Sequence, residues 1–202
     1  MASPGSDLED AREWTKDQWR STLLSRRRRL PASARFAEAI QLTALLTSGK
    51  VVRRGQTLCA YVPIGSEPGS VQMIDEVAAH GVRVLLPIVA GEGPLDWAWY
   101  AGQDSLRPGP FGLLEPIGER LGAAALRIAD MVLVPALGVD RAGVRLGRGA
   151  GYYDRTLVIA APGTPLVAVV RDDETVDRLP REPHDVLMTA ALTPGRGLIQ
   201  LP

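Results

Sequence analysis

A short glycine-rich segment carries the residue types that bind phosphate. It reads Arg145-Leu146-Gly147-Arg148-Gly149-Ala150-Gly151-Tyr152-Tyr153-Asp154. Its three glycines at alternate positions leave backbone N–H groups unshielded, and its two arginines supply positive charge. Asp154 adds a carboxylate, and Mg²⁺ that accompanies a nucleotide usually takes one or two carboxylates. These residue types indicate an anion site for nucleotide phosphates and Mg²⁺; the alternative is a flexible surface loop with a salt bridge.

The flanking sequence places this glycine loop between a strand and a helix. Residues 128–135 form an apolar run typical of a buried strand, and residues 152–160 have helical character. The first N–H groups of a helix lack internal partners, and its dipole places about half a positive charge there. The spacing is not that of a P-loop, because no Lys follows the glycines, and it also differs from G-x-G-x-x-G.

Periodicity predicts the elements that position the loop. Helical patterning covers residues 15–30, 33–47 and 71–80, with Ser33 as the cap of the second helix. Short apolar runs predict strands at residues 57–62, 82–87, 128–134 and 165–170, and residues 95–100 alternate as a further β-element. We therefore expect an α/β fold, a single-domain open and mostly parallel sheet flanked by helices on both faces. In such sheets ligands bind beyond the carboxyl ends of the strands, so the segments after Pro63, Pro87 and Pro135 are expected to line one cleft.

Composition fits one enzyme domain with small-molecule substrates. The chain has 202 residues, a formal net charge of zero and a single cysteine. Zero net charge argues against a nucleic-acid partner, and one Cys excludes a disulfide framework within the chain. No signal-peptide pattern and no run of about 20 apolar residues is visible, so we expect a cytoplasmic protein without a membrane partner. We expect residues 1–13 to form a disordered tail, residues 14–202 to form a single domain, and the protein to be a monomer or weak homodimer.

Two basic or charged features have ordinary structural interpretations. Arg26-Arg27-Arg28-Arg29 is interpreted as a solvated helix end, because four successive helical residues point around the whole circumference. His184 is interpreted as a loop residue beside Asp185, with proton transfer as the alternative.

Four further segments carry characteristic residues at defined spacings. They are Lys16-Asp17-Gln18-Trp19-Arg20, Tyr61 to Glu67, Phe111-Gly112-Leu113-Leu114-Glu115-Pro116, and Leu179-Pro180 with His184-Asp185. Together with the glycine loop, they resemble motifs of the 5-formyltetrahydrofolate cyclo-ligases, also called methenyltetrahydrofolate synthetases: R-L-G-R-G-x-G-Y-Y-D, K-x-x-x-R, an acidic strand end, F-G-x-x-E-P and L-P…H-D. The resemblance covers residues 16 to about 190.

The resemblance implies a reaction. ATP- and Mg-dependent cyclisation would convert 5-formyltetrahydrofolate to 5,10-methenyltetrahydrofolate and release ADP and phosphate. The formyl oxygen is a poor leaving group, so ATP would phosphorylate it first, and N10 would then attack the activated carbon. Phosphoryl transfer needs mainly positioning and charge neutralisation. The alternatives are a non-catalytic relative that binds nucleotide or folate, and an α/β enzyme that acts on another metabolite.

The resemblance also implies roles for individual residues. Arg148 and Tyr152 are the expected catalytic residues, and Asp154 and Asp185 the expected Mg²⁺ ligands. Lys16 and Arg20, one helical turn apart, are expected to bind ATP. The other expected ATP contacts are Arg145, Leu146, Gly147, Arg148, Gly149, Ala150, Gly151, Tyr152 and Tyr153.

The folate contacts implied by the resemblance are Ile64, Glu67, Trp97, Phe111, Glu115, Arg148 and Tyr152. Two of these have alternatives: Glu67 orients the pterin ring or caps the helix after Ser70, and Trp97 stacks on a flat ring or belongs to the core. The chain departs from the family pattern at Pro68-Gly69-Ser70, Ala150 and Thr189.

Overall fold

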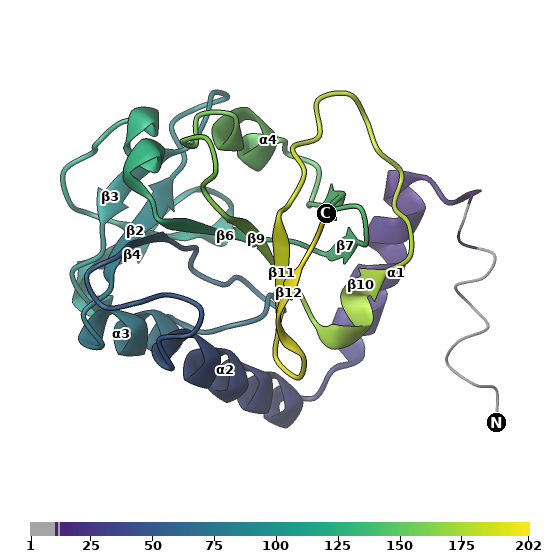
Figure 1. Cartoon of the computed structure of the whole chain (residues 1–202), viewed down its shortest axis with the longest axis horizontal. Helices are drawn as coiled ribbons and strands as arrows, with labels where there is room; N and C mark the ends of the chain where they lie inside the picture. Colours follow the sequence, from purple (N-terminus) through teal and green to yellow (C-terminus); the bar gives the residue numbers. More distant parts are fainter. Residues whose placement is uncertain (1–10, 12) are drawn as a thin grey trace.

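A seven-stranded sheet forms the centre of the computed structural model, which describes Ala11 and residues 13–202 (Figure 1). The strand order is β12-β11-β9-β6-β1-β2-β3. The strands are β1 (Thr57–Cys59), β2 (Arg83–Ile88), β3 (Asp96–Trp99), β6 (Met131–Pro135), β9 (Leu166–Val169), β11 (Ala190–Thr193) and β12 (Gly197–Gln200). Strands β1, β2, β6, β9 and β11 pair in parallel, whereas β3 and β12 are antiparallel edge strands. The predicted open, mostly parallel sheet is confirmed.

Two smaller sheets lie outside the central one. The first joins β10 (Thr175–Val176), β7 (Gly138–Asp140) and β8 (Arg145–Leu146), and the second is a hairpin of β4 (Leu106–Pro108) and β5 (Leu114–Pro116). The apolar-run analysis did not predict these short strands or β11 and β12. Each of these strands has only two to four residues, and a local pattern of that length is too short to identify a strand.

Helices cover both faces of the sheet, as predicted. The α-helices are α1 (Lys16–Arg29), α2 (Ala32–Thr47), α3 (Val71–Ala79) and α4 (Tyr152–Leu157), and the 3₁₀ helices are η2 (Gln103–Ser105), η3 (Pro110–Gly112), η4 (Ala123–Ile128) and η5 (Asp172–Glu174). In Figure 1, α2 and α3 lie below the sheet and α4 lies above it. Leu42 of α2 and Ile74 of α3 pack in one core cluster, and Leu126 of η4 and Leu157 of α4 pack in the other.

The helix starts follow from their capping residues. The hydroxyl of Thr15 accepts a hydrogen bond from the Gln18 N–H, and the Gln18 side-chain oxygen accepts one from the Thr15 N–H, which completes a capping box. The predicted cap at Ser33 is wrong: α2 begins directly after Pro31, so Ser33 already lies in its first turn. The proline suits this position because its fixed φ is compatible with the start of a helix.

Helix α1 docks on the small β10-β7-β8 sheet. Trp19 and Leu23 are buried there against Leu137 and Leu146. Ala11 is 3% exposed and belongs to the same cluster. The rest of the predicted disordered tail, residues 1–10 and 12, lies outside the described residues.

The interpretation of the arginine run as a solvated helix end is wrong at Arg27. This side chain is 2% exposed, and its Nε and Nη2 atoms donate to the Glu174 carboxylate at 2.6 and 2.7 Å. Nη2 also donates to the Ala136 carbonyl at 2.6 Å. A partner far along the chain, at Glu174, makes burial of one arginine of the run possible.

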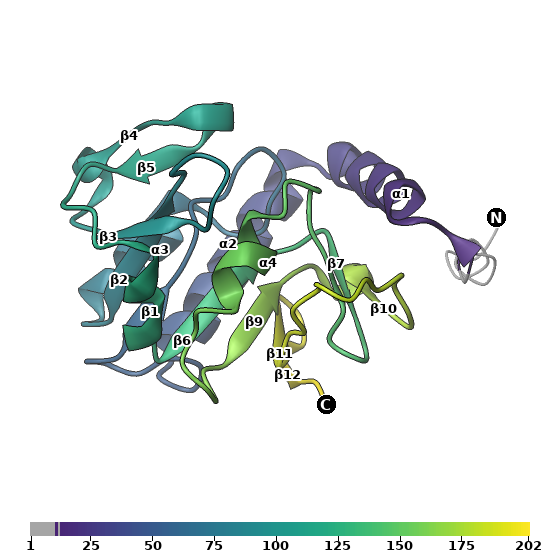
Figure 2. The same ribbon diagram turned by 90° about the horizontal axis from the view of Figure 1, so that it is seen from above.

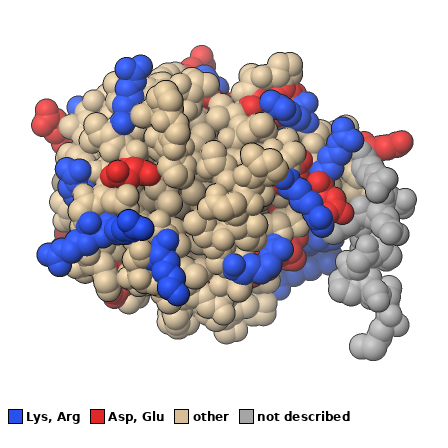
Figure 3. Space-filling view, viewed as in Figure 1, with Lys and Arg blue, Asp and Glu red and all other residues tan. Residues whose placement is uncertain are grey.

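Figure 2 shows α1 and the β4–β5 hairpin projecting at opposite ends of the molecule. On the face shown in Figure 3, basic and acidic side chains are interspersed with uncharged surface. Among the described helices, none has both the length and the apolar character needed to cross a membrane.

Candidate active site

The segments that follow β1, β2 and β6 line one cavity of about 840 Å³. Their lining residues include Tyr61, Val62, Ile64, Glu67, Pro87, Val89, Pro135, Ala136 and Leu137. Because the carboxyl ends of parallel strands meet at one edge of a sheet, these segments come together although they are distant in sequence. The predicted common cleft is therefore confirmed.

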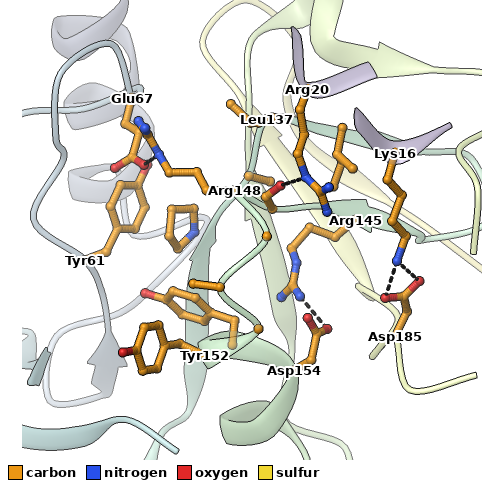
Figure 4. Close-up of a pocket in the computed structure, with 18 of the residues that line it drawn as sticks. Lys16, Arg20, Tyr61, Glu67, Leu137, Arg145, Arg148, Tyr152, Asp154 and Asp185 are labelled. Atoms are coloured by element: carbon orange, nitrogen blue, oxygen red, sulfur yellow. Dashed lines mark hydrogen bonds and ion pairs between the residues drawn. The ribbon is translucent and has the colours of Figure 1, made fainter. Parts of the chain in front are cut away.

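The other walls of the cavity come from α1, the β4–β5 hairpin, the glycine loop and the segment 180–185. Helix α1 contributes Lys16 and Arg20, and the β4–β5 hairpin contributes Phe111 and Leu113. The glycine loop and the segment 180–185 complete the cavity. Figure 4 shows the labelled polar side chains of these elements facing a common space. A cavity of this size falls within the range for small-molecule sites.

The glycine loop keeps its backbone donors free. Within the described part of the chain, no hydrogen bond is donated by a backbone N–H from Gly147 to Asp154. Gly149 and Gly151 have φ values of 103° and 70°, a left-handed backbone that side chains disfavour. Helix α4 starts directly after Gly151, so its first N–H groups add to the same set. The loop presents the donor array that an anion requires.

Arg145 brings a buried positive charge to this array. The residue is 6% exposed, and its Nη2 atom donates to Oδ1 of Asp154 at 2.5 Å. Its Nε and Nη1 atoms are buried and have no hydrogen-bond partner among the described residues. Because buried polar groups are rarely left without partners, these two N–H groups point to a ligand oxygen.

Arg148 and Glu67 face each other at the opposite side of the cavity (Figure 4). The Arg148 Nε donates to Oε1 of Glu67 at 3.0 Å, and the Ile64 N–H donates to Oε2 at 3.0 Å. Glu67 does not cap α3, because the hydroxyl of Ser70 accepts the hydrogen bond from the Met73 N–H. Of the two predicted roles of Glu67, the capping role is wrong.

Lys16 and Arg20 both reach the cavity from α1. The ammonium of Lys16 donates to both oxygens of Asp185 at 2.9 and 2.8 Å and lies 3.2 Å from Oε2 of Glu182. Arg20 donates from Nε to the Gly147 carbonyl at 3.0 Å and pairs with Asp17. Arg20 thus contacts the backbone of the glycine loop itself.

The expected Mg²⁺ ligands offer carboxylates whose donor chemistry fits the ion. Oδ2 of Asp154 accepts no hydrogen bond within the described chain, which leaves one hard oxygen for a metal. Burial raises the pKa of the Asp185 carboxyl, but hydrogen bonds from Lys16 and the Glu182 N–H outweigh this and hold the pKa below its usual value. Asp185 is therefore ionised near neutral pH, as a metal ligand must be.

Glu182 is an acidic residue that the motif analysis missed. Ligand atoms of Glu182, His184 and Asp185 all lie within 4.8 Å of one another. The spacing of Glu182 three residues before Asp185 was the available sequence signal. His184 is exposed and contacts Glu182 at 3.2 Å, which agrees with its interpretation as a loop residue.

Two expected folate contacts do not line the cavity. Trp97 is completely buried between β-strands and η4 in the core, so a stacked ligand would have no access to it. The Glu115 carboxylate accepts a hydrogen bond from the Val89 N–H at 2.8 Å and ties β5 to the end of β2. For Trp97 the core alternative holds, because alternation on β3 turns its side chain inward. The folate contact of Glu115 stays a prediction.

The remaining predicted contacts do reach the cavity. They are Ile64, Phe111, Leu146, Gly147, Gly149, Ala150, Gly151, Tyr152 and Tyr153, in addition to those described above. Phe111 is 76% exposed with a φ of 57°, and its ring centroid lies 6.4 Å from that of Tyr152. Thr189, one departure from the family pattern, hydrogen-bonds the backbone N–H and carbonyl of Leu166 and does not line the cavity.

Fold and site together define an α/β protein with a cavity at the carboxyl ends of its strands, lined by a glycine loop with free backbone donors. The profile of the 5-formyltetrahydrofolate cyclo-ligase family matches residues 12–194, and the chain belongs to this family of ligases. It is 48% identical over 192 residues to the 5-formyltetrahydrofolate cyclo-ligase of Mycolicibacterium smegmatis, covering 93% of this chain and 97% of that one. The Escherichia coli K12 enzyme of the same name is 29% identical over 157 residues, covering 76% and 86% of the two chains.

Solved structures show the same fold. The NMR structure of Aquifex aeolicus 5,10-methenyltetrahydrofolate synthetase has a TM-score of 0.78 and 26% sequence identity, with 92% of each chain covered. A 5,10-methenyltetrahydrofolate synthetase from Mycoplasma pneumoniae has a TM-score of 0.69 at 20% identity, covering 88% of this chain and 98% of that one. The latter likeness supports the fold alone.

Proposed function

We propose that the protein uses ATP and Mg²⁺ to cyclise 5-formyltetrahydrofolate to 5,10-methenyltetrahydrofolate, with release of ADP and phosphate. The observation that carries the proposal is buried Arg145, which lines the same cavity as the free amides of the glycine loop and has two N–H groups without a partner among the described residues. Asp154 already pairs with one nitrogen of this guanidinium, so the other two N–H groups remain for acceptors on a ligand. Phosphate oxygens are charged acceptors that suit an arginine.

The reaction couples two bond exchanges. The formyl oxygen attacks the γ-phosphorus of ATP, the bond to the β-phosphate oxygen breaks, and ADP leaves. N10 then attacks the formyl carbon and loses its proton, and the carbon–oxygen bond breaks as phosphate departs. Both steps move negative charge onto oxygens, so they are favoured by fixed cations and N–H donors.

Individual residues have defined parts in this chemistry. Arg145 and the loop amides hold the phosphates, while Lys16 approaches them from α1. Mg²⁺ held by Asp154 and Asp185 would neutralise phosphate charge during transfer. Arg148 extends from the glycine loop to Glu67, so it is placed to contact the transferring group next to the folate side.

The folate side uses the apolar and acidic wall of the cavity. Glu67 is fixed by the Ile64 N–H and offers its carboxylate to ring N–H groups of the pterin. Phe111 and Tyr152, on opposite elements, provide aromatic surface for a flat ring. The substrates are small molecules, and the interspersed surface charges in Figure 3 agree with this choice.

The proposal is tested with purified protein, ATP, Mg²⁺ and 5-formyltetrahydrofolate, following the methenyl chromophore and phosphate together. We expect one phosphate for each methenyl product. Nucleotide binding without product would identify a non-catalytic relative instead. ATP hydrolysis that requires a different metabolite would also contradict the proposal.

A further inference from the structure

We propose that Arg155 is a positioning residue that fixes the glycine loop in its anion-binding conformation; the proposal rests on the proposed nucleotide function of this loop. Arg155 lies on α4, one helical turn after Gly151, and does not line the cavity. Its Nη2 atom donates to the Ala150 carbonyl at 3.0 Å, and its Nε atom makes a longer bond of 3.4 Å to the Gly93 carbonyl. Arg155 thus bridges the loop and the turn before β3.

The bond to Ala150 determines the direction of the next amide. The described chain has no cis peptide bond, and in a trans peptide the C=O and N–H point in opposite directions. Arg155 holds the Ala150 carbonyl from outside the cavity. The N–H of Gly151, which belongs to the same peptide group, therefore points away from Arg155. Gly151 lines the cavity, so this N–H is available to a ligand there.

Gly151 permits the close approach of Arg155. A Cβ on Gly151 would lie 2.6 Å from Nη1 of Arg155, closer than real contacts allow. Gly151 also has a φ of 70°. Glycine at this position therefore permits the left-handed backbone and also leaves room for the guanidinium that restrains the loop.

Arg155 restrains the neighbouring aromatic residue as well. Its guanidinium carbon lies 5.0 Å from the ring centroid of Tyr152, within the range of a cation–π contact. On the other side of the loop, Arg20 holds the Gly147 carbonyl. Two carbonyls of the loop are therefore fixed by arginines from α4 and α1, and the intervening amides remain free.

The test compares Arg155→Met, Arg155→Lys and a surface control, Arg141→Met. Among the described residues, Arg141 forms its salt bridge with Asp177 at the surface, and the two side chains are 84% and 87% exposed. For each variant we would measure ATP binding by calorimetry, KM for both substrates, kcat and the melting temperature. Calorimetry makes the result independent of turnover.

We expect Arg155→Met to weaken ATP binding and raise the ATP KM by about five- to tenfold, as for loss of one charged hydrogen bond at an exposed site. The folate KM should change by less than about threefold, and the melting temperature should match that of Arg141→Met. Arg155→Lys should restore much of the ATP affinity, since its ammonium can still donate to the Ala150 carbonyl.

ATP binding by Arg155→Met equal to that of Arg141→Met would overturn the positioning role. Equal losses for both substrates together with a lower melting temperature would do the same, because they indicate a general structural role. If the wild-type protein binds ATP without making methenyl product, the proposed function fails while the ATP affinities still decide the role of Arg155. Absence of ATP binding by the wild-type protein would overturn both.

Discussion

At the scale of single residues, the cations of the cavity are held in place by carboxylates. Arg145 pairs with Asp154, Lys16 with Asp185 and Arg148 with Glu67. These pairs fix long side chains that would otherwise lose conformational freedom on binding a ligand. The cost of ordering the cations is therefore met in the folded protein, which favours the proposed binding of phosphates.

Lys16 is expected to serve ATP far more than folate. Removing its charged hydrogen bonds in Lys16→Ala should raise the ATP KM roughly ten- to a hundredfold while the folate KM changes little. Lys50, the other lysine of the chain, is exposed and does not line the cavity, so Lys50→Ala is the matched control. Steady-state kinetics with each substrate varied in turn decides the matter. A rise confined to the folate KM would show that α1 serves the other substrate.

Asp154 is expected to have a metal-binding role beyond its pairing with Arg145. Asp154→Asn retains the side-chain shape but removes the charge, so kcat should fall by several hundredfold or more, as on loss of an electrostatic stabiliser. The variant should also be less stable, because buried Arg145 loses its counter-charge. Titration of activity with Mg²⁺ should recover part of the loss.

The control for this substitution is Asp177→Asn, which alters a surface pair remote from the cavity. It should leave kcat, the Mg²⁺ requirement and the melting temperature unchanged. Near-normal kcat of Asp154→Asn at low Mg²⁺ would contradict the metal role and leave Asp154 as a structural partner of Arg145 only.

At the scale of elements, the edge strand β3 is a structural part of the sheet. Trp97 points into the core, and its indole nitrogen has no hydrogen-bond partner among the described residues. Trp97→Phe should therefore reduce the free energy of unfolding by about 1–3 kcal/mol through lost packing. Both KM values should stay near those of the wild type. Urea unfolding together with kinetics tests this, and a higher folate KM without loss of stability would restore the ligand role.

The carboxylate of Asp172 stabilises the turn between β11 and β12 by accepting hydrogen bonds from it. Burial raises the pKa of this carboxyl, but hydrogen bonds from the Thr193 hydroxyl and the Gly195 and Arg196 N–H groups outweigh it, so the pKa lies below its usual value. A lowered folded-state pKa stabilises the protein above the unfolded-state pKa of about 3.9, and this stability is lost as pH falls through the folded-state value.

Melting temperatures of the wild type and Asp172→Asn between pH 7 and pH 2.5 test this prediction. The variant should be less stable at pH 5–7, and the difference should shrink below about pH 4. Asp177→Asn, at an exposed position, should show no such pH-dependent difference. A constant gap across the range would mean that the carboxylate charge is not what fastens the turn.

At the scale of the whole molecule, a buried charge network attaches α1 to the sheet. Glu174 accepts hydrogen bonds from both Arg27 and Arg171, and Arg171 continues to Glu38 of α2 and to the Ser66 carbonyl. Ser66 precedes Glu67, so the network connects the helix that carries Lys16 with the segment that carries Glu67. The same charge network therefore holds in place both α1 and the segment that carries Glu67, which line different sides of the cavity.

Arg27→Gln should destabilise the protein by about 3–5 kcal/mol, because it leaves Glu174 buried with less compensating charge. Arg29→Gln, two residues along the same arginine run but exposed, should change stability by no more than about 0.5 kcal/mol. Chemical unfolding of both variants provides the comparison. Equal, small effects would mean that the buried pair does not attach α1.

Local sequence patterns predicted much of this fold. The four apolar runs contain β1 and β9 and most of β2 and β6, and the capping and helical patterns locate α1 and α3 within a few residues. These elements were accessible because backbone preference and burial on one face repeat at short spacing. The glycine loop was also identifiable from local sequence, because its glycines lie close together in the chain and determine the conformation of the loop itself.

Long-range pairing was decided only by the tertiary structure. Lys16 meets Asp185 across 169 positions of sequence, and Arg27 meets Glu174 across 147. Neither local charge nor periodicity indicates which cation will be buried. Burial of a cation is favourable only where the fold brings an acidic partner from a distant part of the sequence next to it. The sequence by itself thus determined the strand ends and the loop that we propose to bind a ligand. Packing decided that Trp97 belongs to the core, that Glu115 joins the hairpin to β2, and which ion pairs form around the cavity.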